Sequence, residues 1–239
     1  MTAALEARGI ARSYGGLVAV DGVDLTVPAG RVTALIGPNG AGKSTLFACL
    51  AGQLRPDRGR VLLDGHDVTR LSPDARARRG LARTFQRLAI FGSLTVADNV
   101  RIGAENAGRP ADVDERVAAM LDLLGLAGVA SARASALPTG TLRLVELARA
   151  LAGQPRVVLL DEPTSGLDDE QAARVPVALR AMANAGRAVV IVEHDLPLVF
   201  AAADVVHVLA RGHIVAAGTP LQVRADPATA AAFAIGVQP

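Results

Sequence analysis

The sequence of 239 residues predicts an α/β fold built on a parallel sheet. Two aliphatic runs, 32–36 and 156–162, are typical of strands that are covered on both faces. The first run leads through a glycine-rich loop into a helical pattern, and the second ends in the acids Asp161 and Glu162. Because ligands bind open parallel sheets at the carboxyl ends of the strands, these two strand ends predict the functional site.

The glycine-rich loop fits the phosphate-binding pattern GxxxxGK[ST] at every fixed position. Its glycines let successive backbone N–H groups turn inward, and the helix that follows adds its positive end. The pattern therefore predicts a nucleotide site in a P-loop NTPase (RecA-like) core; the alternative is a glycine-rich turn without a ligand. The predicted phosphate-binding residues are Gly37, Pro38, Asn39, Gly40, Ala41, Gly42, Lys43, Ser44 and Thr45.

Within this site, Lys43 is expected to face the β- and γ-phosphates and Ser44 to bind Mg²⁺. Mg²⁺ prefers hard oxygen ligands, so Asp161 is the second expected ligand. Glu162 points another way and could orient or deprotonate a water in line with the γ-phosphate. A cap or turn role for both acids is the alternative, and the phosphate loop upstream argues against it.

The remaining segments predict two additions to this core within a single domain. Residues 5–27 alternate apolar and polar side chains, which is typical of antiparallel strands. Residues 87–153 read as a mainly helical insertion, so the core with its β subdomain is expected in 1–86 and 154–239. The other predicted elements are strands at 60–65, 188–193, 205–209 and 213–215, and helices at 113–124, 142–151 and 227–233.

Composition argues against several other classes of protein. The net charge is only +2, so no nucleic-acid partner is expected, and the basic stretch 76–79 reads as a solvated helix face. No apolar run approaches the ~18 residues of a membrane span, and no secretion signal is seen, so a cytoplasmic location is expected. The single cysteine, Cys49, is expected to be a buried hydrophobe.

With these motifs in order, the sequence closely resembles the ATP-binding subunits of ABC transporters over almost its full length. The resemblance identifies 37–45 as the Walker A loop, Asp161 and Glu162 as the Walker B pair, and 165–168 as the D-loop. It implies an ATPase that uses ATP and Mg²⁺. The implied catalytic residues are Glu162, His194, Gln86 and Lys43, the implied metal ligands are Ser44, Gln86 and Asp161, and the implied further nucleotide contacts are Tyr14, Thr139, Gly140 and Asp168.

Tyr14 is the only tyrosine of the chain and lies upstream of the phosphate loop, where it could stack on adenine. From position alone, a core or turn tyrosine is an equal alternative. The resemblance favours adenine, and it also makes Gln86 a sensor of Mg²⁺ and of a transmembrane subunit. A nearby groove for that subunit is predicted to be lined by Phe85, Leu88, Ile90, Phe91, Leu94 and Val96, although core packing is the alternative.

The segment 137–141 reads Leu-Pro-Thr-Gly-Thr where the family has LSGGQ, so only Leu137 and Gly140 are kept. An L-P-x-G motif resembles the importers of branched-chain amino acids and related amides, as do the stretches 14–20, 82–86 and 193–195. That resemblance implies a heterodimer with a second ATPase subunit (a homodimer being possible), transmembrane permease subunits, an indirect solute-binding partner, and a place at the inner face of the cell membrane. It also suggests that one ATP site hydrolyses slowly.

Two rival functions stay open at this point. One is a soluble ABC ATPase that acts without membrane subunits, and the chain has neither the long coiled-coil insertion nor the second nucleotide domain of known examples. The other is a regulatory module that binds ATP and hydrolyses it weakly, which the altered 137–141 segment suggests. The presence of Lys43, Asp161, Glu162 and His194 argues against it.

Overall fold

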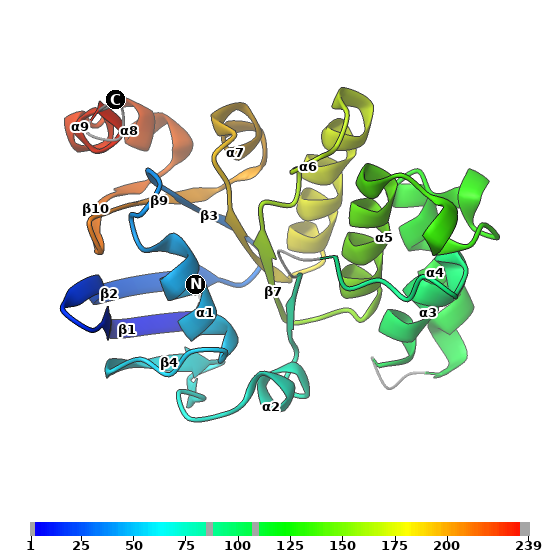
Figure 1. Ribbon diagram of the computed structural model, residues 1–239, viewed down its shortest axis with the longest axis horizontal. Coiled ribbons are helices and arrows are strands. Elements are labelled where there is room, and N and C mark those ends of the chain that lie inside the picture. Colours follow the sequence, from blue (N-terminus) through cyan, green and yellow to red (C-terminus); the bar gives the residue numbers. More distant parts are fainter. Residues whose placement is uncertain (1–2, 85–87, 107–109, 235–239) are drawn as a thin grey trace.

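A computed structural model describes residues 3–84, 88–106 and 110–234, and in it the chain forms two sheets and a group of helices (Figure 1). The smaller sheet is antiparallel. The larger sheet is parallel except for the strand at one edge that comes last in the chain. The smaller has the order β2 (Leu17–Pro28), β1 (Ala3–Tyr14), β4 (Arg58–Leu63), β5 (His66–Asp67); the larger has the order β10 (His213–Gly218), β9 (Val205–Ala210), β3 (Val32–Ile36), β8 (Ala188–Val192), β7 (Val157–Asp161), β6 (Leu81–Arg83).

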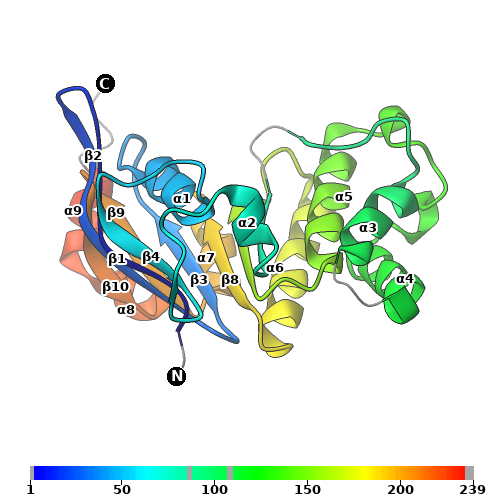
Figure 2. The same ribbon diagram turned by 90° about the horizontal axis from the view of Figure 1, so that it is seen from below.

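The helices cover the larger sheet and build a separate helical region at one end, seen on the right of Figures 1 and 2. That region consists of α3 (Val96–Glu105), α4 (Val113–Leu123) and α5 (Thr139–Ala152), with short 3₁₀ turns at Pro110–Asp112, Ala127–Val129 and Ala134–Ala136. The others are α1 (Lys43–Ala51), α2 (Pro73–Ala77), α6 (Asp169–Asn184), α7 (Leu196–Ala202), α8 (Pro220–Ala225) and α9 (Pro227–Ala234). Within the described ranges, none has both the length and the apolar character needed to cross a bilayer.

The aliphatic strands are buried because helices or the second sheet cover both faces of the larger sheet. Side chains alternate along β3, so Ala34 and Leu35 face opposite layers. Leu35 joins one core with α1 and the antiparallel sheet, where Phe47 is fully buried. Ala34 joins the other core with α6, α7 and the helical region. The continuous hydrophobic runs in the sequence follow from this two-sided burial.

Most predicted elements are present, but α6, α7, α8 and β6 were not predicted, and three further details differ. The helix predicted at 142–151 begins at Thr139, directly after Pro138. Val96, predicted to line a groove, is fully buried at the start of α3. The sequence analysis did not predict α3, although its capping box is readable: the Thr95 hydroxyl accepts from the Asp98 N–H at 3.1 Å.

The prediction of a solvated helix face at 76–79 is wrong for Arg76, which is fully buried. Its guanidinium donates to the carbonyls of Cys49 and Leu50 at 2.8 and 2.6 Å, and to those of Thr69 and Leu71. The last carbonyls of a helix lack partners within it, so Arg76 closes the C-terminal end of α1. Burial lowers the pKa of this guanidinium. Cys49 is buried beside it, as predicted.

We expect Arg76→Met to lower the free energy of unfolding by about 3 kcal/mol, because several buried carbonyls lose a charged donor. Chemical denaturation of the full chain measures this change. Arg79→Met is the matched control, since Arg79 is exposed, and it should change the stability by less than about 0.5 kcal/mol. Equal effects of the two substitutions would contradict the role given to Arg76.

His207 on β9 has two buried ring nitrogens, which have no hydrogen-bond partner among the described residues. Desolvation lowers its pKa to about 4. His207 therefore takes up a proton near pH 6.5 in the unfolded chain but not in the folded chain. The free energy of unfolding falls as the pH drops through this range. We expect this residue to contribute a loss of about 1.4 kcal/mol per pH unit between pH 6.5 and 4.

Denaturation of the His207→Leu variant across this pH range tests the expectation. The variant should lose stability less steeply than the unmodified chain on acidification. His66→Leu serves as the control because His66 is exposed, and its profile should match that of the unmodified chain. Parallel profiles for the unmodified chain and the His207 variant would show that His207 is not the group responsible.

Candidate nucleotide site

The phosphate loop joins β3 to α1 and is packed against backbone from two other segments. Gly37 and Gly42 have φ angles of 152° and 105°. A Cβ atom at Gly37 would collide with the carbonyl of Leu209, and one at Gly42 with the carbonyl of Ala19. Backbone atoms cannot move aside as a flexible side chain can, so both positions require glycine. The sequence pattern thus has a structural basis in this chain.

Lys43, the first residue of α1, has its ammonium group folded over this loop. Its Nζ donates to the carbonyls of Gly37 at 2.6 Å and Pro38 at 2.9 Å. Burial lowers the pKa of Lys43, and the nearby charges of Glu162 and Asp161 oppose that effect. The predicted phosphate-facing cation and the two predicted acids are therefore close enough to interact.

Asp161 lies at the carboxyl end of β7 with only 3% of its side chain exposed. Burial raises its pKa, and the main opposing effect comes from Arg83, whose Nη2 lies 3.6 Å from the Asp161 Oδ2. The sequence analysis did not single out Arg83. Its position becomes visible only in the sheet, where β6 pairs with β7 and places Arg83 opposite Leu159.

Arg83 itself is held by contacts with α1. Its guanidinium lies 4.9 Å from the centre of the Phe47 ring and donates to the Gln53 side chain. Both partners belong to α1 or its C-terminal end, so the helix that begins at the phosphate loop also supports the side chain that pairs with Asp161.

The donors at this site suit a magnesium ion. Ser44 offers an exposed hydroxyl at the second position of α1, and Asp161 offers a buried carboxylate that a cation would stabilise. The described residues hold no group of three or more His, Cys, Asp or Glu side chains that could bind a metal by themselves. The remaining ligands would have to be phosphate oxygens and waters, as is usual for Mg²⁺. Gln86, the third predicted ligand, lies outside the described residues.

Glu162 and His194 follow neighbouring parallel strands and face one another. The His194 Nδ1 lies 3.7 Å from the Glu162 Oε1. Glu162 adopts a φ of 47°, and its N–H donates to the Val192 carbonyl at 2.9 Å, so the ladder between β7 and β8 continues one step past the strand end. Both side chains are partly exposed, at 40% and 69%, which leaves them accessible to a ligand.

A residue that the sequence analysis gave no role, Glu193, lies directly behind this pair. Its side chain is fully buried and accepts hydrogen bonds from the hydroxyl and the N–H of Thr164, at 2.7 and 3.2 Å. It also accepts from the N–H of His194 at 3.2 Å. A glutamate at the end of an aliphatic strand was the readable signal, because such a group needs donors once it is buried.

Tyr14 ends β1 at the tip of the first hairpin and is 44% exposed. The Arg12 guanidinium lies 5.2 Å from the centre of its ring. The next strand of the hairpin contacts the phosphate loop, since the Ala19 carbonyl is adjacent to Gly42. The aromatic ring therefore belongs to the hairpin that packs on the loop, and stacking on adenine stays a prediction.

The remaining predicted contacts, Thr139, Gly140 and Asp168, lie apart from the phosphate loop. Thr139 and Gly140 begin α5, which both views place in the helical region away from α1 (Figures 1 and 2). A Cβ at Gly140 would lie 2.5 Å from the Gln171 Oε1 and 2.9 Å from the Gly166 carbonyl. Asp168 caps α6, accepting from the Gln171 N–H at 2.8 Å. Within one chain, the start of α5 at Gly140 therefore lies against the segment 166–171, which contains Asp168.

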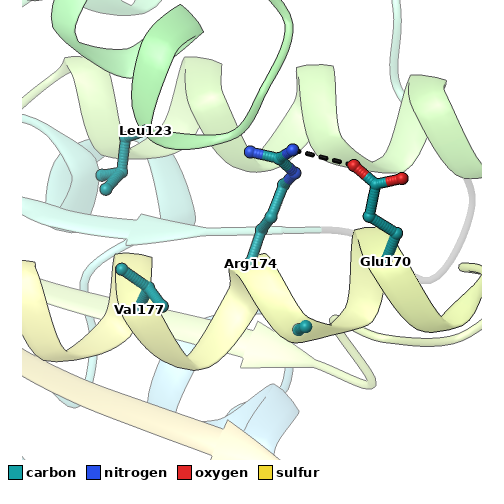
Figure 3. A pocket seen from close by; sticks show the side chains of 5 residues that line it. Leu123, Glu170, Arg174 and Val177 are labelled. Atoms are coloured by element: carbon teal, nitrogen blue, oxygen red, sulfur yellow. Dashed lines mark hydrogen bonds and ion pairs between the residues drawn. The ribbon is translucent and has the colours of Figure 1, made fainter.

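The hollows of the described part of the chain include two that lie outside the phosphate loop. The larger, about 720 Å³, separates the helical region from the core, and Gln53, Ala77, Arg83, Phe91 and Arg149 are among the residues that line it. Among the described members of the predicted groove, Phe91 lies on its wall, and Phe85 lies outside the described residues. The smaller, about 300 Å³, lies between α4 and α6, where Arg174 pairs with Glu170 at 2.9 Å beside Leu123 and Val177 (Figure 3).

A protein-family model described as "ABC transporter" matches residues 20–165, more than half of the chain. The chain belongs to the ABC transporter family. Its structure is the ABC ATPase fold: a P-loop core, an antiparallel β subdomain and a helical subdomain. It superposes on the ADP conformation of MJ1267, described as an ATP-binding cassette of an ABC transporter, with a TM-score of 0.85 and 30% identity over 98% of this chain and 99% of that one.

Relatives with different named substrates resemble this chain to similar degrees. The sulfate/thiosulfate import ATP-binding protein CysA of Mycobacterium bovis is 40% identical over 96% of this chain. The chain spans 65% of the length of CysA. The high-affinity branched-chain amino acid transport ATP-binding protein BraF of Pseudomonas aeruginosa is 34% identical over 93% of this chain and 94% of BraF. The lipopolysaccharide export system ATP-binding protein LptB of Acidithiobacillus ferridurans is 35% identical, with 95% of both chains covered.

Two substitutions should separate binding from hydrolysis at this site. Lys43→Ala should weaken ATP binding roughly thirtyfold, about 2 kcal/mol, because it removes the charged donor predicted to face the phosphates. Glu162→Gln should leave the affinity within about twofold and abolish phosphate release, because it keeps the shape and removes the predicted base. Direct titration of ATP and steady-state phosphate release measure the two effects. Unchanged affinity in the first variant, or unchanged turnover in the second, would contradict the assigned roles.

Proposed function

We propose that this chain binds ATP with Mg²⁺ and hydrolyses it to drive a membrane importer. The observation that carries the proposal is the convergence of Lys43, Asp161, Glu162 and His194 at the carboxyl ends of adjacent parallel strands, beside the phosphate loop. Lys43 binds the phosphates, and Ser44, Asp161 and Gln86 hold the magnesium ion. Glu162 activates water, and His194 contacts the γ-phosphate. Tyr14 stacks on the adenine.

We further propose that two ATPase subunits close head to tail on two ATP molecules. The support is the separation within one chain: Thr139 and Gly140 begin α5 away from the phosphate loop, on a helix N-terminus suited to a phosphate. In a head-to-tail pair they reach the partner's ATP, and Asp168 lies in the D-loop at the junction. Pro138 replaces the serine hydroxyl of the family motif, which favours a heterodimer in which one site is slower.

The transmembrane partner docks, on this proposal, in the hollow between the core and the helical region. Its volume of about 720 Å³ accommodates a protein segment, and Phe91 offers a half-exposed aromatic face on its wall. Arg83 lines the same hollow and also pairs with Asp161. A single side chain thus connects the proposed docking surface to the nucleotide site. The chain is then peripheral, on the cytoplasmic face of the membrane.

For the cargo, we propose branched-chain amino acids or related amides, delivered by a solute-binding protein. The L-P-x-G form of residues 137–140 favours this class, and BraF matches over nearly its full length. The names of CysA and LptB keep sulfate import and lipopolysaccharide export as the competing transport classes. A soluble ABC ATPase and a weakly hydrolysing regulatory module remain the non-transport alternatives.

An affinity pull-down of this chain from solubilised membranes tests the proposal. We expect two permease subunits and a second ATPase, identified by mass, in a complex that hydrolyses ATP and is stimulated by a solute-binding protein loaded with a branched-chain amino acid. Recovery with soluble partners or nucleic acid alone would overturn the transporter proposal. Recovery of a complex stimulated by sulfate would overturn only the choice of cargo.

A further inference from the structure

We propose that Glu193 is a positioning residue that fixes the mutual geometry of Glu162 and His194 by joining the two loops that carry them. The inference rests on the catalytic roles proposed for that pair. Thr164 is the partner of Glu193 on the other loop, and neither residue touches the nucleotide in this proposal. Glu193 and Thr164 act by placing the side chains of Glu162 and His194.

One carboxylate accepts three hydrogen bonds from these two loops. The Glu193 Oε1 accepts from the Thr164 hydroxyl at 2.7 Å and from the Thr164 N–H at 3.2 Å, while the Oε2 accepts from the His194 N–H at 3.2 Å. Thr164 follows Glu162 by two residues, and His194 follows Glu193 directly. A single side chain therefore bridges the turn after β7 and the turn after β8.

Burial makes this bridge specific. The Glu193 side chain is fully buried, and a buried carboxylate is stable only where donors replace the water that it loses. Among the described residues, its donors come from these two turns. A shift of either turn would remove a donor from a buried charge, so the two turns favour one relative position.

That position sets the distance between the catalytic groups. The β7 and β8 strands pair Asp161 with Val192, and the Glu162 N–H bonds the Val192 carbonyl beyond the strand ends. The His194 Nδ1 then lies between two carboxylates, 3.7 Å from the Glu162 Oε1 and 3.9 Å from the Glu193 Oε2. The imidazole is 69% exposed, and the Glu193 bridge holds its backbone.

Substitution of Thr164 in the full chain tests the inference without touching the acids. Thr164→Val keeps the shape and removes the 2.7 Å hydroxyl bond, and Thr164→Ser keeps the hydroxyl. We expect Thr164→Val to lower kcat roughly tenfold, the equivalent of ~1.4 kcal/mol, and to leave the ATP affinity within about twofold. Thr164→Ser should restore kcat to within about twofold of the unmodified chain. Unchanged kcat in Thr164→Val, where His194→Ala lowers it, would overturn the inference and leave the proposed function intact.

A double-mutant cycle with His194→Ala shows whether the effect passes through His194. In the His194→Ala background, Thr164→Val should cause no further loss of kcat, because the group that it positions is already absent. If the losses of kcat from the two substitutions multiply, Thr164 acts independently of His194, and the inference is overturned. Unchanged kcat in His194→Ala alone would overturn both this inference and the catalytic role proposed for His194.

Hydrogen exchange separates loss of the bridge from general unfolding. In Thr164→Val, amides in the segments 162–166 and 192–196 should exchange faster, and those of α3 should keep the protection that they have in the unmodified chain. Faster exchange throughout the chain would overturn the inference, because the loss of kcat would then reflect general destabilisation.

Discussion

The site depends on one constraint, the contact of the phosphate loop with backbone on two sides. The Ala41 carbonyl accepts from the Gly212 N–H at 2.9 Å, and the Gly212 carbonyl accepts from the Asp21 N–H at 2.9 Å. These bonds tie the loop to the β9–β10 turn and to the first hairpin, that is, to both sheets. Because the contacts are backbone to backbone, they fix the loop without using the side chains that chemistry needs. The Lys43 ammonium, which donates to the Gly37 and Pro38 carbonyls, and the exposed Ser44 hydroxyl take no part in these backbone contacts.

The carboxylate of Asp161, beside this loop, interacts with several charged side chains of both signs. Asp161 is buried next to Arg83 and within range of Lys43, Glu162 and Glu193, so its environment contains charges of both signs. Burial opposes its ionised form, and Arg83 is the main group that favours it. A magnesium ion would add a further favourable charge to those of Arg83 and Lys43, since desolvated carboxylates are stabilised by nearby cations. Arg83, supported from α1, keeps this acid paired within the chain.

The sequence predicted those parts of the structure that depend on local pattern. The phosphate loop, the aliphatic strands and the Walker B acids are readable because glycine spacing and two-sided burial leave a direct trace in the residues. Arg76 was misread because a basic cluster looks the same whether one of its members turns outward or caps a helix 26 residues earlier in the chain. Arg83 and Glu193 were missed because their partners are set by strand order, which local patterns do not encode. For Gln86 and for the limits of the helical subdomain, prediction from sequence still stands untested.

The segment after Glu162 connects features that the sequence presents as separate motifs. At one end, Thr164 binds Glu193 and so reaches the loop of His194. At the other end, Gly166 and Gln171 contact Gly140, and the Gln171 Nε2 donates to the Thr141 hydroxyl at 3.4 Å. A Cβ at Gly140 would press on the Gly166 carbonyl, so glycine is required there by packing within the chain, irrespective of any phosphate. The altered 137–141 segment keeps the glycine that this contact needs, and a displacement of residues 164–168 would act on the start of α5 and on the loop of His194 together.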